Sequence, residues 1–412
     1  MKGPKIGSVP NGVTVNTGMF PKLPEKNEEF SSKFENEVER PFPPSPKNVM
    51  KAKAPEGSHY FEDEENNTII SRPIVLQNFQ GISRTGWIPP DPVMAVGPNH
   101  IMICVNSSFR IFDKSGNVLK TITSASWFNS IASGSGPNDP QVLYDHFAQR
   151  WIMVWMTSPT ATEHYHLFSI SDDDNPLGTW YNWKTDATIV GDSSIHSWGD
   201  YPALGFDEQA LYLVSRQFPL SAGADFFCKL RIVEKSPLYA NTAGKISWID
   251  FWDFREPQNF NVVDFVRPAT TFGSPGIAFL MNASPFGNGT YFTLWKISNP
   301  VSHPEISAIN IPVTAYSNAR NAAQLGTSTT VENFGGSSIK NNVVLDALDI
   351  SQFGSLNHFF EFLRLCQISS YVCLNKIIWQ CDSPNTRNKS STILCGTSPA
   401  NPRSVNTCDV SQ

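Results

Sequence analysis

Three aspartates and one arginine recur at one position of a repeated motif. Asp91 and Asp139 directly precede a proline, Asp200 precedes one by two residues, and Arg267 takes the same place in a fourth copy. Two carboxylates roughly 5 to 10 Å apart can act as acid and base in glycoside hydrolysis, and a ring of carboxylates can bind Ca²⁺. These four residues are therefore the candidate catalytic residues. The three aspartates are also the candidate metal ligands, and Ca²⁺ is the one cofactor that the pattern suggests.

A structural role explains the same aspartates equally simply. Aspartate before proline often begins a turn, because its carboxylate accepts hydrogen bonds from nearby backbone N–H groups. Both interpretations stay open at the level of sequence. They differ in one respect, since a site requires the carboxylates to converge and turn capping does not.

Aromatic residues precede two of these aspartates. Trp87 lies four residues before Asp91, while His196 and Trp198 lie just before Asp200. Aromatic rings beside carboxylates in a surface loop can form a platform for a sugar. Trp87, His196 and Trp198 are therefore candidate ligand-binding residues, and packing between repeats is the alternative for both tryptophans.

The elements that must position these residues form a repeat. Its copies cover residues 91–96, 139–144, 200–205 and 267–272, and their prolines lie 48, 62 and 66 residues apart. Each copy is followed by a turn and by further apolar runs with β-type alternation. Such a period is typical of a β-propeller. We predict an all-β fold, a propeller of four-stranded antiparallel blades with the copies as innermost strands, and about five to seven blades, not all of them complete.

The chain divides into three parts by composition. Residues 1–68 are rich in proline and charge and predict an extended or disordered leader, and residues 69–345 carry the propeller pattern. Residues 346–412 hold five of the seven cysteines, at spacings that fit no zinc site. This tail is anomalous, and either a frameshift or an appended module explains it. We expect it to add no complete blade.

Composition limits the partners. The 412 residues carry a formal charge of −6, so no basic surface is expected for nucleic acid or an anionic membrane. No apolar run is long enough for a transmembrane segment, and the first residues show no signal peptide. We expect a monomer without nucleic acid partners, and a glycan or cell-surface polymer as the ligand.

The first copy of the repeat resembles a family of secreted bacterial propeller proteins, most of them uncharacterised. The resemblance extends over about residues 78–345 and implies an extracellular or periplasmic propeller without an established reaction. It is carried by Pro89-Pro90-Asp91-Pro92, by Ala95-Val96-Gly97-Pro98-Asn99-His100 and by Phe112-Asp113-Lys114-Ser115-Gly116.

A second segment is similar to the Asp-box of sialidase-like propellers, Ser-x-Asp-x-Gly-x-Thr-Trp. Residues 171–180 begin with Ser-Asp-Asp and end with Gly-Thr-Trp, but Gly178 lies three residues later than in the motif. Only the role of a hairpin turn carries over, since the arginines and the Tyr/Glu pair of sialidases have no counterparts that we can place. We therefore expect a binding or surface module with glycan as its ligand. A glycan-active hydrolase or lyase that uses the acids at the channel mouth is the alternative.

Overall fold

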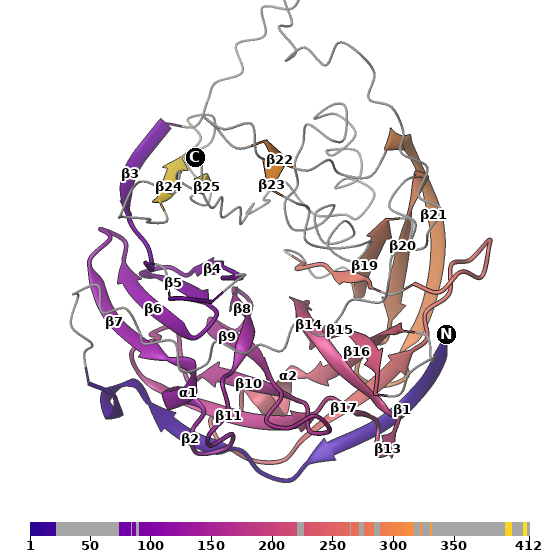
Figure 1. Ribbon diagram of the computed structural model, residues 1–412, viewed down its shortest axis with the longest axis horizontal. Helices are drawn as coiled ribbons and strands as arrows, with labels where there is room; N and C mark the ends of the chain where they lie inside the picture. Colours follow the sequence, from indigo (N-terminus) through magenta and orange to yellow (C-terminus); the bar gives the residue numbers. More distant parts are fainter. Residues whose placement is uncertain are drawn as a thin grey trace, which may run out of the picture.

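The computed structural model describes residues 1–21, 74–83, 85–87, 90–220, 226–263, 265–271, 276–283, 289–316, 322–323, 330–331, 392–397 and 407–409. Nearly all its regular structure is β, arranged as antiparallel sheets around an axis (Figure 1). Within these ranges, no helix is both long and apolar enough to cross a membrane.

Four sheets form the blades, each listed here from its inner to its outer strand. The first blade has β4 (Val93–Val96), β5 (His100–Val105), β6 (Ser108–Asp113) and β7 (Val118–Thr123). The second has β8 (Asn138–Asp145), β9 (Arg150–Thr157), β10 (Tyr165–Ser171) and β11 (Thr179–Asp186). The third has β14 (Ser197–Phe206), β15 (Ala210–Pro219), β16 (Phe227–Glu234) and β17 (Ile246–Trp252). The fourth has β18 (Arg267–Pro268), β19 (Ile277–Ala283), β20 (Gly289–Ser298) and β21 (Glu305–Tyr316).

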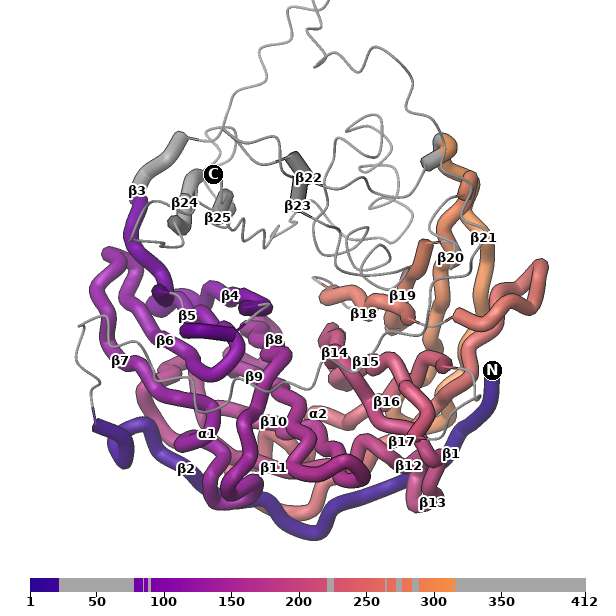
Figure 2. The backbone as a smooth tube through the Cα atoms, viewed as in Figure 1, coloured from indigo at the N-terminus to yellow at the C-terminus, as the bar shows by residue number. Residues whose placement is uncertain are grey.

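The predicted repeat strands are the innermost ones. Strands β4, β8, β14 and β18 each begin a sheet, and each contacts its neighbour around the axis (Figure 2). The prediction of an all-β propeller of four-stranded antiparallel blades is therefore confirmed. The total number of blades stays a prediction, because much of the chain after residue 316 lies outside the described residues.

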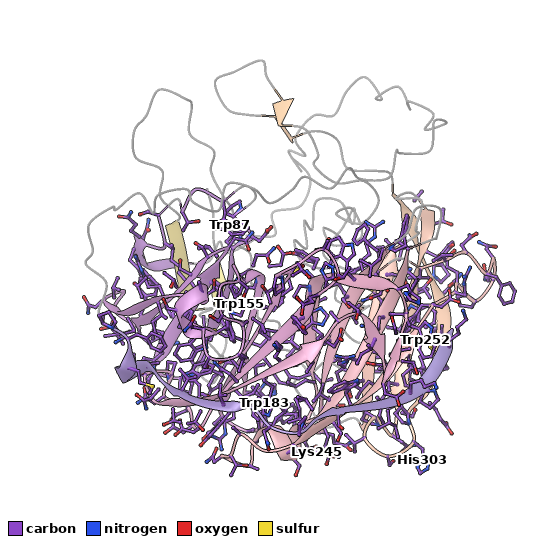
Figure 3. The ribbon with its side chains drawn as sticks, turned by 60° about the horizontal axis from the view of Figure 1, so that its bottom comes forward. Trp87, Trp155, Trp183, Lys245, Trp252 and His303 are labelled. Carbon is purple, nitrogen blue, oxygen red and sulfur yellow. The ribbon has the colours of Figure 1, made fainter. Side chains whose placement is uncertain are left out.

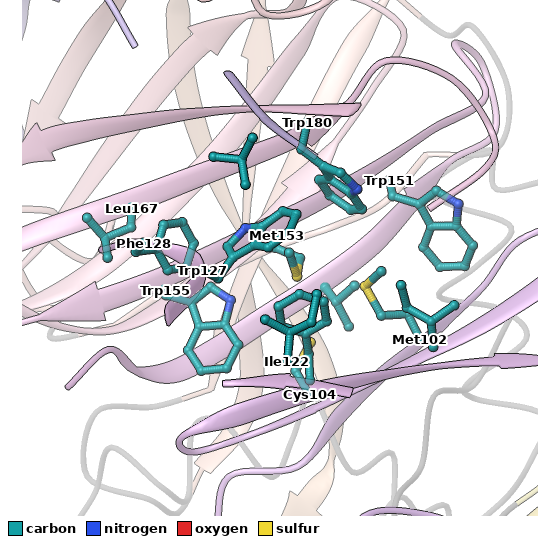
Figure 4. Packing of buried hydrophobic residues seen from close by; sticks show 14 of the residues in the cluster. Met102, Cys104, Ile122, Trp127, Phe128, Trp151, Met153, Trp155, Leu167 and Trp180 are labelled. Atoms are coloured by element: carbon teal, nitrogen blue, oxygen red, sulfur yellow. The ribbon is translucent and has the colours of Figure 1, made fainter. Parts of the chain in front are cut away.

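The blades pack face to face, which explains why their middle strands are apolar on both sides. Separate apolar clusters fill the three interfaces between consecutive blades. In the first interface, Trp127 from α1 (Ser124–Trp127) meets Trp180 edge to face at 5.8 Å, and Trp155 packs against Phe128 (Figure 4). Burial of such large rings supplies much of the stabilisation of the fold.

Residues 1–20 form what we call the N-terminal belt. Strand β1 (Lys2–Val9) pairs with β17, and β2 (Val13–Asn16) pairs with β11, so each adds a fifth, outer strand to a blade. After η1 (Thr17–Met19), the ring of Phe20 contacts Trp127 beside the first blade. The belt thus follows the outer rim of three blades (Figure 2).

Two glycines allow the belt to approach the blades closely. A Cβ at Gly7 would lie 2.4 Å from the backbone oxygen of Gly191, and one at Gly12 would lie 2.4 Å from that of Asn182. The leader is thus extended where it is described, and residues 22–68 lie outside the described residues.

Backbone pairing also joins the start of the propeller sequence to the predicted tail. Strand β24 (Thr392–Thr397) pairs with β3 (Ile74–Gln80) on one side and with β25 (Thr407–Asp409) on the other. The rest of the predicted tail lies outside the described residues. The remaining elements are short: α2 (Lys235–Leu238), and the paired strands β12 (Ile189–Val190) with β13 (Ser193–Ser194) and β22 (Ala322–Ala323) with β23 (Thr330–Val331).

Candidate functional site

The residue directly before each repeat proline occupies one structural position at the start of an inner strand. Asp91, Asp139 and Tyr201 hold this position in the first three blades with left-handed φ values of 41°, 47° and 45°. Arg267 holds it in the fourth. Non-glycine residues rarely adopt such angles, and their recurrence at one end of the axis marks this place as unusual.

Tyr201, rather than Asp200, is therefore the third member of this set. The register of β14 shifts between Asp200 and Ala203, as that of β8 shifts between Asn138 and Gln141. A bulge of this kind adds a residue and turns the following side chains. We call Asp91, Asp139, Tyr201 and Arg267 the axial set.

The two aspartates of the axial set lie together. A side-chain hydrogen bond with Asp139 is one of the influences on the pKa of Asp91. Asn106, which is fully buried, donates from Nδ2 to Asp91 Oδ2 at 2.7 Å and accepts at Oδ1 from the Asp139 backbone N–H at 2.7 Å. Asn106 thus links the first and second blades through the carboxyl of Asp91 and the backbone of Asp139.

Burial controls the protonation of this pair. It raises the pKa of Asp91 above its usual range, although the hydrogen bonds from Asp139 and Asn106 act in the opposite direction. Asp139 is only 8% exposed, so its carboxyl also lies away from bulk water. Asp91 is therefore more easily protonated than a surface aspartate would be.

Tyr201 and Arg267 form the other half of the axial set. Their side chains are hydrogen-bonded, and the guanidinium lies 5.4 Å from the centre of the Tyr201 ring and 5.7 Å from that of Phe265. Burial raises the pKa of Tyr201, and the charges of Asp91 and Asp139 raise it further. All four side chains therefore share one electrostatic environment.

Trp87 lies close to the axial set. A Cβ added at Gly136, three residues before Asp139, would meet Trp87 at 3.8 Å, and the nearby Thr85 hydroxyl donates to the backbone oxygen of Asn106 at 3.2 Å. The indole is half-buried and lies on the opposite side of the molecule from Trp183 and Lys245 (Figure 3). Its position suits a ring beside a ligand at the axis.

Trp198 lies on the inner strand β14 of the third blade, and His196 directly precedes this strand. Trp198 stacks against His164 at 5.3 Å and against Phe218 at 5.0 Å, with interplanar angles of 24° and 22°. This is packing between the second and third blades, the alternative raised from the sequence. His196 is exposed, and its backbone oxygen accepts from Leu220 N–H.

Asp200 lies one residue before the axial set's position in the third blade. It lies opposite Arg216 in the pairing of β14 with β15, and the Arg216 guanidinium lies over the rings of Phe218 and Phe226. No group of three or more His, Cys, Asp or Glu side chains that could hold a metal ion occurs among the described residues. The three predicted aspartates therefore do not form a common ligand set.

Sequence reasoning did not identify Asn106 and Tyr201. Tyr201 could have been found by aligning the copies strictly on the residue before proline, which separates it from Asp200. Asn106 carried no such signal, because it lies in the turn after β5, and its role depends on Asp139 in the next blade.

Comparisons with known proteins complete the description of the site. No family model matches the chain, and no curated protein matches it. Among solved structures, the chain is similar to a subtype N10 neuraminidase-like protein of A/little yellow-shouldered bat/Guatemala, with a TM-score of 0.32 and 9% identity over 59% of this chain and 65% of that one.

Two further similar structures come from bacteria. A xylan beta-1,4-xylosidase from Bacillus halodurans C-125 has a TM-score of 0.33 and 12% identity over 57% of this chain and 42% of that one. A bifunctional GH43-CE protein of Bacteroides eggerthii has a TM-score of 0.29 and 12% identity over 60% of this chain and 30% of that one. The chain spans less than two thirds of each of the three proteins. Function is therefore argued from the residues of this chain.

Proposed function

We propose that the axial set and Trp87 form a carbohydrate-binding site at one end of the propeller. The carboxyl pair and Tyr201 supply hydrogen-bonding groups for sugar hydroxyls, and the half-buried Trp87 supplies an apolar face beside them. The location outside the cytoplasm that the family resemblance implies is part of the same proposal.

The contact between Asp91 and Asp139 is the observation that favours binding over hydrolysis. Retaining glycosidases hold their two carboxyl groups about 5 Å apart and inverting ones about 6.5 to 9.5 Å apart, because a sugar carbon or a water must fit between them. Hydrogen-bonded carboxyl groups lie closer together than either arrangement, and a bond of this kind with Asp139 is one of the influences on the pKa of Asp91. Their position suits hydrogen bonds to two neighbouring hydroxyl groups of a sugar better than attack on a glycosidic bond.

A glycan array combined with a panel of chromogenic glycosides tests the proposal. We expect the protein to bind glycans and to release no chromophore. Asp91→Ala and Trp87→Ala should each weaken binding at least tenfold, because they remove a polar contact and the apolar face. Asp192→Asn is the matched control, since Asp192 is exposed near β13, and it should bind like the wild type.

Two results would contradict this proposal. Release of chromophore that disappears in Asp91→Ala would favour the hydrolase instead. Unchanged glycan binding in both alanine variants would place the binding site elsewhere on the molecule.

A further inference from the structure

A buried histidine lies in the interface between the second and third blades. His166, on β10, is 1% exposed, and neither of its ring nitrogens has a hydrogen-bond partner among the residues that the structure describes. A neutral imidazole has one donor and one acceptor, and both are costly to bury without partners. A bound ion or water beside the ring would remove this cost.

Lys229, on β16, is buried in the same interface. It is 1% exposed, and its Nζ donates to the backbone oxygens of Ala187 at 2.6 Å and Ile189 at 3.0 Å. An ammonium has three N–H donors, so one remains. Within the described part of the chain, Lys229 has no carboxylate at ion-pair distance, and the nearby Asp250 pairs instead with Arg231 at 2.9 Å. A buried ammonium without a counter-ion is unfavourable.

Gly199, on β14, shows how these two side chains are placed. A Cβ added at Gly199 would lie 3.2 Å from His166 Cε1, 2.7 Å from Gln217 Nε2 and 2.9 Å from Ser215 Oγ. Ser215 lies directly opposite Lys229 in the pairing of β15 with β16, so both side chains are on the same face of the third blade. The ring of His166 therefore packs on the face that carries Lys229. We call His166, Ser215, Gln217 and Lys229 the interblade cluster.

The interblade cluster presents donors rather than acceptors. Gln217 Nε2 donates to Ser215 Oγ at 2.7 Å, which leaves the hydroxyl proton of Ser215 for another acceptor. The third N–H of Lys229 and the N–H of His166 are the other two donors. Three donors on facing side chains suit an anion, and one buried ammonium balances one negative charge.

We propose that the interblade cluster binds one small monovalent anion, of the size of a halide, together with a proton on Lys229. The Lys229 ammonium, the His166 N–H and the Ser215 hydroxyl donate to the anion. Entry of the anion alone would bury a net charge, but the anion and the proton together add none. Sulfate is excluded, because its second charge has no counterpart and all four side chains of the cluster are buried. The site does not depend on the proposed carbohydrate binding.

The proton links anion binding to pH. The charged and titratable groups around Lys229 are Arg231, Asp250, Asp186, His166 and His164. Burial lowers the pKa of Lys229 to about 7, and it lowers the pKa of His166 well below its usual range, so His166 stays neutral. A bound anion favours the ammonium and therefore raises the pKa of Lys229. Affinity for the anion should be highest below about pH 7 and should fall as the pH rises further.

Calorimetry on the full chain tests the site with sodium bromide at constant ionic strength. We expect one bromide per chain and, above about pH 7, uptake of a proton, which is read from the dependence of the heat on the buffer. Lys229→Met should abolish the proton uptake and weaken bromide binding about tenfold or more. His166→Phe should weaken binding and keep the proton uptake. Lys184→Met is the matched control, since Lys184 is exposed on β11, and it should behave like the wild type.

Anomalous diffraction from a bromide-soaked crystal of the wild type locates the ion without any variant. We expect a peak between the second and third blades, beside His166 and Lys229. Bromide at the surface only, as an adventitious ion only, would overturn the proposal, and so would a wild type that binds no bromide in solution.

Equal bromide affinity and proton uptake in Lys229→Met and the wild type would also overturn the proposal. If Lys229→Met does not fold, the position of the bromide peak in the wild type decides. Glycan binding enters none of these measurements, so a failure here leaves the carbohydrate proposal as it stands.

Discussion

At the scale of single residues, Asp250 organises the interface between the second and third blades. It is fully buried and accepts from Arg231 Nε and Nη2 at 2.9 Å each, from Gly191 N–H at 2.8 Å and from Trp248 Nε1 at 3.0 Å. The Arg231 guanidinium also lies 4.1 Å from the centre of the Trp248 ring. Removing one member of such a pair leaves the other charge buried and uncompensated.

Asp250→Ala should therefore lower the free energy of unfolding by about 3 to 5 kcal/mol, measured by urea denaturation. Asp253→Ala is the control. It removes a carboxylate that pairs with Lys2 and Arg255, whose side chains are 64% and 39% exposed, so it should cost no more than about 1 kcal/mol. Equal, small losses in both variants would show that Arg231 finds another partner.

The same interface makes stability depend on pH. Burial lowers the pKa of Lys229 to about 7, with Arg231 acting in the same direction and Asp250 and Asp186 against it. Burial also lowers the pKa of His166 well below its usual range, helped by Lys229, Arg231 and His164. Between about pH 10 and pH 7 the unfolded chain binds a proton at Lys229 that the folded chain does not, so stability should fall as the pH falls.

Thermal melting of Lys229→Met tests this effect. The variant should lose less stability than the wild type between about pH 10 and pH 7, because its side chain cannot bind the proton. His166→Gln should instead reduce the loss below about pH 6.5, where the unfolded histidine becomes charged. Parallel pH profiles in Lys229→Met and the wild type would mean that the Lys229 amine stays protonated when folded.

At the scale of elements, the belt depends on close backbone approach. Gly7→Ala would place a Cβ 2.4 Å from the Gly191 backbone oxygen and 2.5 Å from Trp248, so β1 should detach from β17 or shift. We expect a loss of about 1 to 3 kcal/mol and faster hydrogen exchange of the β1 amides. Gly244→Ala, where the nearest atom is Thr242 Oγ1 at 3.4 Å, should change neither. If the β1 amides of Gly7→Ala are as well protected from hydrogen exchange as those of the wild type, the neighbouring residues shift enough to accommodate the added methyl group.

Strands could be predicted from the sequence where the pattern of residue types matches the burial of the strand. The inner strands carry proline at a fixed place and are buried on both faces, so the repeat identified all four. Strand β1 could not be found in this way. It has one partner strand and is exposed at most positions, and its Gly3-Pro4 and Gly7 weaken any period-two pattern. The exchange of Asp200 for Tyr201 has a different cause, because alignment of the copies on the residue directly before proline gives Tyr201 from the sequence alone.

At the scale of the whole molecule, the pairing of β24 with β3 bears on the predicted tail. Strand β3 precedes the first blade, and among the described residues its sheet is completed by chain from beyond residue 390. Pairing of distant segments of this kind can close the ring of a propeller. The sequence could not indicate it, because the contact joins residues more than 300 positions apart.

A chain that ends at Leu345 tests the contribution of the pairing between β24 and β3. It lacks β24 and β25, so β3 would lose its partners, and we expect a clear drop in melting temperature. The comparison is a chain that ends at Val405, which keeps β24 and lacks only β25, and which should lose less. Equal melting temperatures in the full-length chain and the one ending at Leu345 would support the interpretation of residues 346–412 as an anomalous tail.

The belt also has a consequence for how the protein is made. Strand β1 leaves the ribosome before the blades do, and its partner β17 is synthesised roughly 240 residues later. At about 5 to 20 residues per second, the nascent N-terminus waits roughly 12 to 50 s for a place to dock. Once docked, it lies on the outer rim beside β17 (Figure 1). A reporter fused ahead of Met1 would therefore be displayed at the circumference of the propeller.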